Sequence, residues 1–159
     1  MDLREVFERQ NRRIYRLAML YLKNVADAED AVQNVFLKYI EKEVFFEDVA
    51  RETAWFIAVT RNYCKDQLRS FWKKRVDMGE IPEPVTWEKT DYELYEQIMK
   101  LPDKYREVLY LYYYEDYSVR EMADILSRNG STIQTQLADA RKKLKSELEK
   151  EESKWIRER

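Results

Sequence analysis

The stretch SVREMADILSRNGSTIQTQLADARKKL, from Ser118 to Leu144, predicts two short helices joined by a tight turn. Ser118 and Glu121 have the spacing of a capping box, in which each side chain bonds the other residue's backbone N–H at a helix start. The apolar stripe of the first helix consists of Val119, Met122, Ile125 and Leu126. Ser127 to Gly130 then forms the turn, and Gly130 is where we expect a positive φ.

The second helix of this stretch is predicted to begin at about Ser131 or Thr132. Its expected buried line is Ile133, Leu137, Ala140, Leu144 and Leu148. The side chains off that line are Gln134, Thr135, Gln136, Asp139 and Arg141. Two helices with such a turn fit a helix-turn-helix, whose second helix can enter the DNA major groove. An ordinary helical hairpin would give the same pattern, so the rest of the chain has to decide.

The composition indicates an all-α protein without obvious catalytic groups. The 159 residues include only two glycines and three prolines while 38% are charged, which is typical of a nearly wholly helical protein of one medium or two small domains. Because the formal charge is −2, any basic footprint for nucleic acid must be local. Histidine is absent, which removes the usual general base near neutral pH and the common metal ligand. We therefore expect neither an enzyme nor a cofactor or metal site.

Cysteine content and hydropathy bear on the compartment. Cys64 is the only cysteine, which excludes an internal disulfide and suits a reducing cytoplasm. The sequence has no apolar run long enough to span a bilayer, and Met1 to Gln10 lacks the apolar core of a signal peptide. We expect a cytoplasmic protein with no direct membrane insertion.

Two amphipathic helices are predicted at the start of the chain. The first, about Leu3 to Lys23, is expected to bury Leu3, Phe7, Ile14, Leu17, Ala18 and Tyr21. The second, Asp27 to about Glu41, is expected to bury Ala28, Ala31, Val32, Val35, Phe36, Tyr39 and Ile40. Its opposite face is wholly polar and consists of Asp30, Gln33, Asn34, Lys38 and Glu41. Such a face is either simply solvated or a binding surface.

The next segments combine aromatic and basic residues. Glu43 to Glu52 breaks the helical period, and its residues Val44, Phe45 and Phe46 either plug a core or hold a loop rigid for a ligand. A helix is predicted from Thr53 to about Lys74, with aromatic and cationic side chains that include Trp55, Phe56, Tyr63, Arg61, Lys65 and Arg69. This combination suits base stacking and phosphate pairing on an unpaired strand. A helix buried between two neighbours, with a basic frayed end, is the alternative.

An acidic segment divides the chain into two predicted domains. Val76 to Lys89 contains one glycine, two prolines and four acidic residues, which disfavour regular structure. The second domain opens with a capping box formed by Thr90 and Glu93, and Pro102 suits the first position of a helix that reaches about Glu115. The predicted ranges are 1–75 for the first domain, 76–89 for the linker, 90–150 for the second domain and 151–159 for a fraying tail.

Four stretches, in this order, give the chain a resemblance to a known family. They are DAEDAVQNVFLKYI (Asp27 to Ile40), TAWFIAVTRNYCKDQLR (Thr53 to Arg69), LPDKYREVLYLYYYEDYS (Leu101 to Ser118) and the helix-turn-helix through ADARKKL (Ala138 to Leu144). Across nearly its whole length the chain resembles a bacterial RNA polymerase sigma factor of the two-domain extracytoplasmic-function (ECF) group, in the sigma-70 family. The resemblance implies a protein that binds core RNA polymerase and directs promoter recognition and transcription initiation.

The same resemblance implies roles for particular residues. The polar face expected to dock on polymerase consists of Asp30, Gln33, Asn34 and Lys38. The residues expected to bind the minus-ten element and the melting strand are Val44, Phe45, Phe46, Glu47, Asp48, Arg51, Trp55, Arg61, Asn62, Lys65 and Arg69. Those expected to read the minus-thirty-five element are Arg128, Ser131, Thr132, Gln134, Thr135, Gln136 and Arg141. The implied partners are core polymerase, promoter DNA and an anti-sigma factor that can hold the protein at a membrane, with no small-molecule substrate.

The recognition helix departs from the family's usual pattern of lysine, serine and arginine. This chain has Gln134, Thr135 and Gln136 there, and the loss of two cations should flatten the salt dependence of DNA binding. Arg128 stands where an apolar turn residue is usual, and Asn34 where an acid is common. Two alternative functions therefore stay open. One is a sigma-like protein that binds polymerase or a regulator without efficient initiation, and the other is a free-standing helix-turn-helix regulator.

Overall fold

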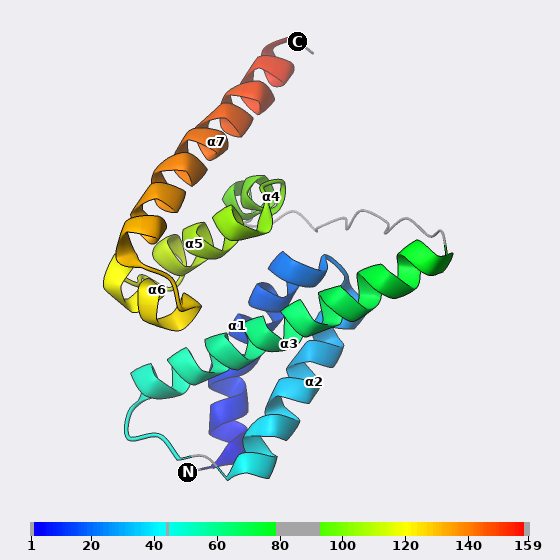
Figure 1. The fold of residues 1–159 in the computed structure, drawn as a ribbon, viewed down its shortest axis with the longest axis vertical. Coiled ribbons are helices and arrows are strands. Elements are labelled where there is room, and N and C mark those ends of the chain that lie inside the picture. The colour runs from blue at the N-terminus through cyan, green and yellow to red at the C-terminus, as the bar shows by residue number, and fades with distance from the viewer. Residues whose placement is uncertain (1, 44, 79–92, 158–159) are drawn as a thin grey trace. The chain divides into compact units, whose positions relative to one another are not determined.

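The computed structural model describes residues 2–43, 45–78 and 93–157 and folds them into seven α-helices with no β-strand (Figure 1). The helices are α1 (Leu3–Leu22), α2 (Val25–Lys42), α3 (Val49–Met78), α4 (Glu93–Met99), α5 (Asp103–Tyr113), α6 (Val119–Leu126) and α7 (Gly130–Arg157). The chain divides into two compact units, residues 1–87 and 88–159. The predicted all-α class is confirmed. None of the described helices is long and apolar enough to cross a membrane.

The first unit is a bundle in which α1, α2 and α3 each contact the other two. Side chains at the two helix starts cap the backbone: Asp2 accepts from the N–H of Arg4 and Asn24 accepts from the N–H of Asp27, each at 3.0 Å. An apolar cluster draws on all three helices and consists of Val6, Ile14, Val35, Phe36 and Phe56. Burial of these side chains fixes the three helices against one another.

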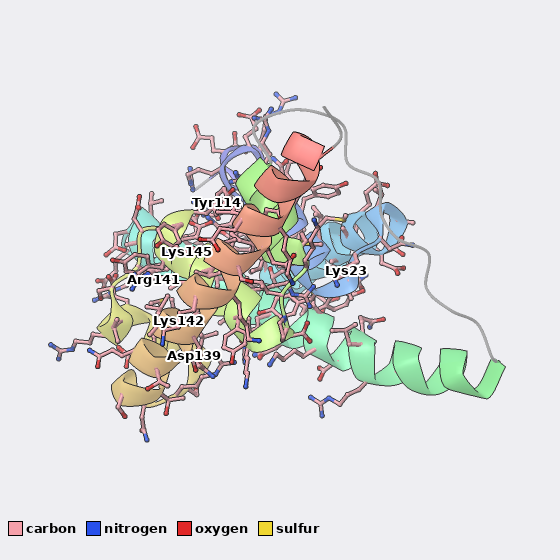
Figure 2. The ribbon with its side chains drawn as sticks, turned by 90° about the horizontal axis from the view of Figure 1, so that it is seen from above. Lys23, Tyr114, Asp139, Arg141, Lys142 and Lys145 are labelled. Carbon is pink, nitrogen blue, oxygen red and sulfur yellow. The ribbon has the colours of Figure 1, made fainter. Side chains whose placement is uncertain are left out.

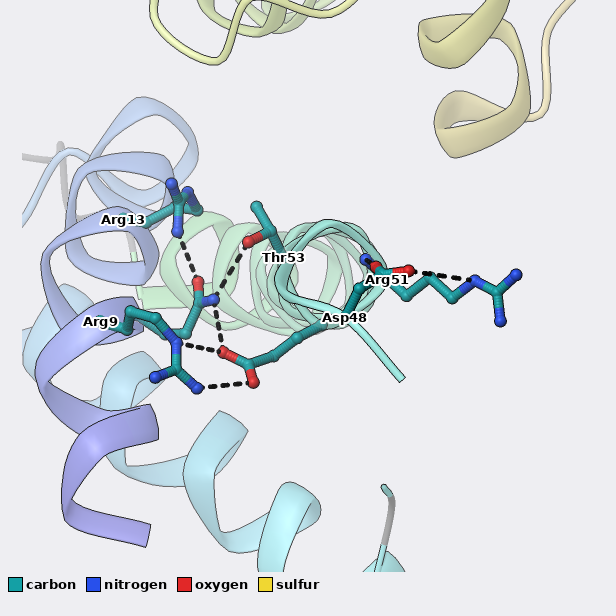
Figure 3. Close-up of polar contacts among 7 residues, drawn as sticks. Arg9, Arg13, Asp48, Arg51 and Thr53 are labelled. Atoms are coloured by element: carbon teal, nitrogen blue, oxygen red, sulfur yellow. Dashed lines mark hydrogen bonds and ion pairs between the residues drawn. The ribbon is translucent and has the colours of Figure 1, made fainter. Parts of the chain in front are cut away.

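A polar clip joins α1 to the start of α3 (Figure 3). The Glu52 side chain is only 1% exposed, and its two carboxylate oxygens accept from Arg9 at 3.0 Å and 2.8 Å. Gln10, also buried, donates to Glu52 at 2.9 Å and to the Thr53 hydroxyl at 3.1 Å. The Gln10 carbonyl oxygen accepts from Arg13 at 2.6 Å. Burial raises the pKa of Glu52, but the hydrogen bonds from Arg9 and Gln10 outweigh it and hold that pKa below its ordinary value.

The clip explains why the predicted buried face of α1 was partly wrong. Leu3 and Phe7 are exposed, whereas Val6 and Gln10 are fully buried. A buried glutamine is invisible to an apolar pattern, so the predicted stripe was placed one position off in the first turns. From Ile14 onward the predicted residues are all buried, but Met19 and Leu20 are buried as well, so the end of α1 is covered on more than one side. The Phe7 ring still contacts Phe36, with ring centroids 4.9 Å apart.

The boundaries of α2 and α3 also differ from the prediction. Ile40 is exposed, because the last turn of α2 has passed the edge of the core. The α3 helix starts at Val49, four residues earlier than expected, because the Asp48 carboxylate accepts from the Arg51 backbone N–H at 2.7 Å and forms an N-cap. The helix continues to Met78, three residues into the predicted linker.

The second unit packs α5 against α7, with α4 and α6 contacting both. Its buried apolar side chains are Ile98, Met99, Leu101, Tyr105, Val108, Leu109, Tyr110, Leu111, Met122, Leu126, Ile133, Leu137, Ala140 and Leu144. Pro102 is the N-cap of α5 rather than its first residue. The predicted capping box at Thr90 lies outside the described residues.

The helix-turn-helix is confirmed, with two corrections to its turn and end. The Ser118–Glu121 capping box forms as predicted, with both bonds present at 3.0 Å and 3.1 Å. The positive φ, 53°, falls at Ser127, while Gly130 is the first residue of α7. Leu148 is exposed rather than buried, and α7 continues through the predicted tail to Arg157, in a stretch rich in glutamate and lysine, which favour helices.

Candidate functional site

The polar face of α2 is exposed, as the sequence predicts. Asp30, Gln33, Asn34 and Lys38 all lie on the solvent side of α2. The Asn34 amide donates to the Tyr63 hydroxyl on α3 at 3.2 Å, and the Lys38 ammonium lies 5.5 Å from the centroid of the Tyr63 ring. Tyr63 of α3 therefore contacts the side chains of Asn34 and Lys38 on this face. No local pattern in α2 could reveal this role.

A small pocket adjoins the same face. Its lining residues are Leu22, Asp27, Asp30, Tyr63 and Gln67. Burial raises the pKa of Tyr63, and the nearby Asp30 carboxylate adds to the effect. The phenol thus stays neutral near pH 7 and presents a hydrogen-bonding group beside the acidic start of α2.

An exposed phenylalanine follows α2, beside a stack of aromatic rings. Phe45 is 82% exposed. The neighbouring Phe46 stacks on Tyr39 with ring centroids 6.5 Å apart and an interplanar angle of 14°, and it contacts the Trp55 ring at 5.8 Å. The centroids of the Trp55 and Tyr39 rings are 5.9 Å apart. The stack anchors the segment and leaves Phe45 available for contact, while the predicted Val44 lies outside the described residues.

The polar residues predicted beside Phe45 are exposed but engaged with one another. Arg51 donates to the Glu47 carboxylate at 2.7 Å, and Asp48 caps α3. Exposed pairs of this kind contribute little to stability and are easily exchanged for another anion. Arg51 can thus leave Glu47 for a phosphate at small cost.

The predicted cationic residues of α3 follow along the helix. Arg61 and Lys65 are half-buried, whereas Asn62 and Arg69 are exposed. Arg69 pairs with Asp66 at 3.1 Å in a solvent-exposed contact. The spacing of four residues places Arg61, Lys65 and Arg69 along one side of α3. This arrangement suits the predicted role of these cations in binding the melting strand.

The residues predicted to read the minus-thirty-five element, on α7 and in the turn before it, fall into an exposed group and a half-buried group. Ser131, Thr132, Gln134 and Thr135 are exposed near the start of α7. Arg128 is not: its side chain is 18% exposed and pairs with the carboxylate of Glu107 on α5, which is 2% exposed. Arg128 also donates to the Gln136 carbonyl oxygen at 3.1 Å. Glu107 was not among the predicted site residues, and its only signal in the sequence is a charged residue within the apolar run of α5.

A basic surface continues along α7. Figure 2 shows Asp139, Arg141, Lys142 and Lys145 projecting from this helix, and the three cations are exposed. Arg141 donates to the Tyr113 hydroxyl at 3.1 Å, and its guanidinium lies 4.9 Å from the centroid of the Tyr112 ring. Although the net charge of the chain is −2, its basic residues thus form a local surface on α7. Two tyrosines of α5 hold Arg141 in place on this surface.

The two units match separate parts of one protein family. A family model described as Sigma-70 region 2 matches residues 6–74, and one described as Sigma-70, region 4 matches residues 92–144. RNA polymerase sigma factor SigV of Bacillus subtilis is 32% identical over 142 residues, which cover 87% of this chain and 86% of SigV. The chain belongs to the ECF group of sigma factors. Sigma factors are non-enzymatic proteins that bind core RNA polymerase and promoter DNA, and this one acts in promoter recognition.

Other similar proteins support the assignment of this chain to the ECF sigma factors. ECF RNA polymerase sigma factor SigW of Bacillus subtilis is 28% identical over 157 residues, covering 86% of this chain and 83% of SigW. The fold is similar to that of the sigma factor RpoE, solved in complex with the anti-sigma factor NepR from Bartonella quintana. That likeness has a TM-score of 0.81 and 22% identity, and it covers 93% of this chain and 97% of RpoE.

Proposed function

We propose that this ECF sigma factor divides promoter recognition among three surfaces. The polar face of α2 docks on core polymerase, the segment after α2 together with α3 captures and holds the melting minus-ten strand, and the start of α7 reads the minus-thirty-five element. These surfaces belong to a first domain of residues 1–75 and a second domain of residues 90–150, joined by a linker at 76–89 and followed by the last residues, 151–159.

Phe45 is the observation that carries the assignment of the melting surface. A phenylalanine that is 82% exposed in the free protein contributes almost nothing to the core. An extruded base loses its stacking partners, and an exposed ring on an anchored segment replaces them. The adjoining stack of Phe46, Tyr39 and Trp55 limits the motion of the segment and so lowers the entropy cost of capture.

The α3 cations complete this surface. Arg61, Lys65 and Arg69 lie along one side of the helix that begins four residues after Phe45. A row of positive charge beside a stacking ring fits a single strand, whose phosphates follow its bases. Polymerase binding relies instead on α2, so the two activities should separate by mutation.

Regulation by an anti-sigma factor forms part of the proposal. The sigma factor RpoE, which has a similar fold, was solved with an anti-sigma factor bound. We place the present protein in the cytoplasm, where polymerase works, with an anti-sigma factor able to hold it inactive or at a membrane.

Run-off transcription with purified core polymerase tests the assignment of Phe45. A Phe45→Ala variant should bind core polymerase normally yet open the promoter about tenfold less, because stacking of one base contributes ~1–3 kcal/mol. Permanganate reactivity of unpaired thymines measures the opening. Val25→Ala, at another exposed apolar position of the first unit, is the control and should change neither quantity.

A double variant of Arg61 and Arg69 to alanine tests the α3 surface. It should impair promoter melting more than polymerase binding, and loss of polymerase binding would contradict the assignment. Polymerase binding by the wild type without any transcript would favour the sigma-like alternative. DNA binding without polymerase binding would favour the free-standing regulator.

A further inference from the structure

The helix-turn-helix contains two glutamines, Gln134 and Gln136, whose surroundings differ. They are two positions apart on α7 and therefore about 200° apart around the helix axis. Gln134 is exposed, whereas Gln136 is half-buried on the flank that faces the turn. The same side chain type thus occurs once on an open flank and once against another part of the protein.

The carbonyl oxygen of Gln136 is held by Arg128. A guanidinium has only donors, so the Gln136 atom that meets Arg128 at 3.1 Å must be the oxygen. Arg128 is itself fixed by the buried carboxylate of Glu107. A charged bond from Arg128 to Glu107 is stronger than a neutral one, and breaking it would leave a buried charge unpaired. The orientation of the Gln136 amide is consequently fixed from within the protein through its oxygen.

We propose that Gln134 alone of the two glutamines reads a base, and that Gln136 serves with Arg128 and Glu107 to hold the turn against α5. Bidentate recognition of adenine requires both the amide oxygen and the amide nitrogen of one glutamine. Gln134 can offer both groups, whereas the Gln136 oxygen already accepts from Arg128. Among these residues the sequence preference therefore depends on Gln134, with an adenine at the base pair that it meets. This inference rests on the proposed reading of the minus-thirty-five element.

Two matched variants, Gln134→Ala and Gln136→Ala, separate the roles. Each full-length protein with core polymerase selects from a promoter library randomised in the upstream element, and thermal unfolding of each free protein is measured in parallel. Gln134→Ala should reduce the preference for adenine at one position on the order of tenfold and leave the unfolding temperature unchanged. Gln136→Ala should keep the selected sequence and lower the unfolding temperature by about 4 °C, because Arg128 loses an acceptor.

The outcomes distinguish this inference from the proposed function. If the wild type selects no upstream sequence, the proposed reading fails, and the inference fails with it. If the wild type selects a motif and Gln136→Ala removes a base preference, the inference alone is overturned. A Gln134→Ala variant with the wild-type motif overturns it equally.

Discussion

Removal of Arg9 is the most direct probe of how the first unit is held together. Breaking a buried ion pair by removing one partner costs about 3–5 kcal/mol, because the remaining charge stays buried. Here Glu52 is 1% exposed, but Arg9 is 32% exposed and Gln10 keeps its own bond to the carboxylate. We therefore expect Arg9→Met to lower the free energy of unfolding by about 2–3 kcal/mol, a large fraction of a typical domain's total.

Urea unfolding of the full-length protein at pH 7, followed by circular dichroism, measures this loss. Hydrogen exchange of peptides from α1 and α3 assigns it to the first unit. Arg51→Met is the matched control, since Arg51 also pairs with a glutamate, at 2.7 Å, but both of those side chains are exposed. That variant should change stability by less than about 0.5 kcal/mol.

The pH dependence provides an independent check of the mechanism. The pKa of folded Glu52 lies below its ordinary value of 4.5, so its contribution is present above pH 4.5 and is lost as the pH falls through the folded pKa. A protonated Glu52 carboxyl is neutral, so its burial no longer requires the compensating charge of Arg9. The stability gap between wild type and Arg9→Met should therefore close as the pH falls from 7 to below 4.5. Equal urea midpoints at pH 7, or a gap that stays constant down to low pH, would refute the reasoning.

Three further results are expected. Ser118→Ala should destabilise the second unit by about 1 kcal/mol, because it removes one bond of the capping box, and thermal unfolding measures this. Burial raises the pKa of Cys64 to about 12, so the native thiol should resist alkylation at pH 8 until urea unfolds the protein; rapid labelling of the native state would contradict this. Tyr113→Phe removes the hydroxyl that orients Arg141 and should weaken promoter binding several-fold at low salt, with a smaller effect at high salt, in a filter-binding titration.

The local features of the fold were readable from the sequence. The Ser118–Glu121 box depends on two residues of one turn, and it forms as predicted. The exposed face of α2 follows from helical periodicity alone. Both depend on interactions within about one turn of helix or on a repeat within a single element, so no knowledge of tertiary contacts was needed.

The features that were missed depend on partners far apart in the chain. Gln10 and Glu52 are 42 positions apart, and Glu107 and Arg128 are 21 apart. No pattern in the neighbouring sequence predicts that a polar side chain will be buried against a distant partner. Arg128 was predicted to contact DNA from the family resemblance, and no local signal indicated that it also pairs with the buried carboxylate of Glu107.

Within residues 2–43, 45–78 and 93–157, four helix junctions hold non-glycine residues in the left-handed region of φ, namely Lys23, Glu43, Asp116 and Ser127. A side chain in this conformation costs roughly 1 kcal/mol relative to glycine. The protein can therefore be stabilised further: Lys23→Gly or Glu43→Gly, both in the first unit, should each raise the free energy of unfolding by about 0.5–1 kcal/mol, which thermal unfolding can measure. Since most substitutions destabilise, such gains would let the recognition helix acquire new side chains, and with them new promoters, without loss of the fold.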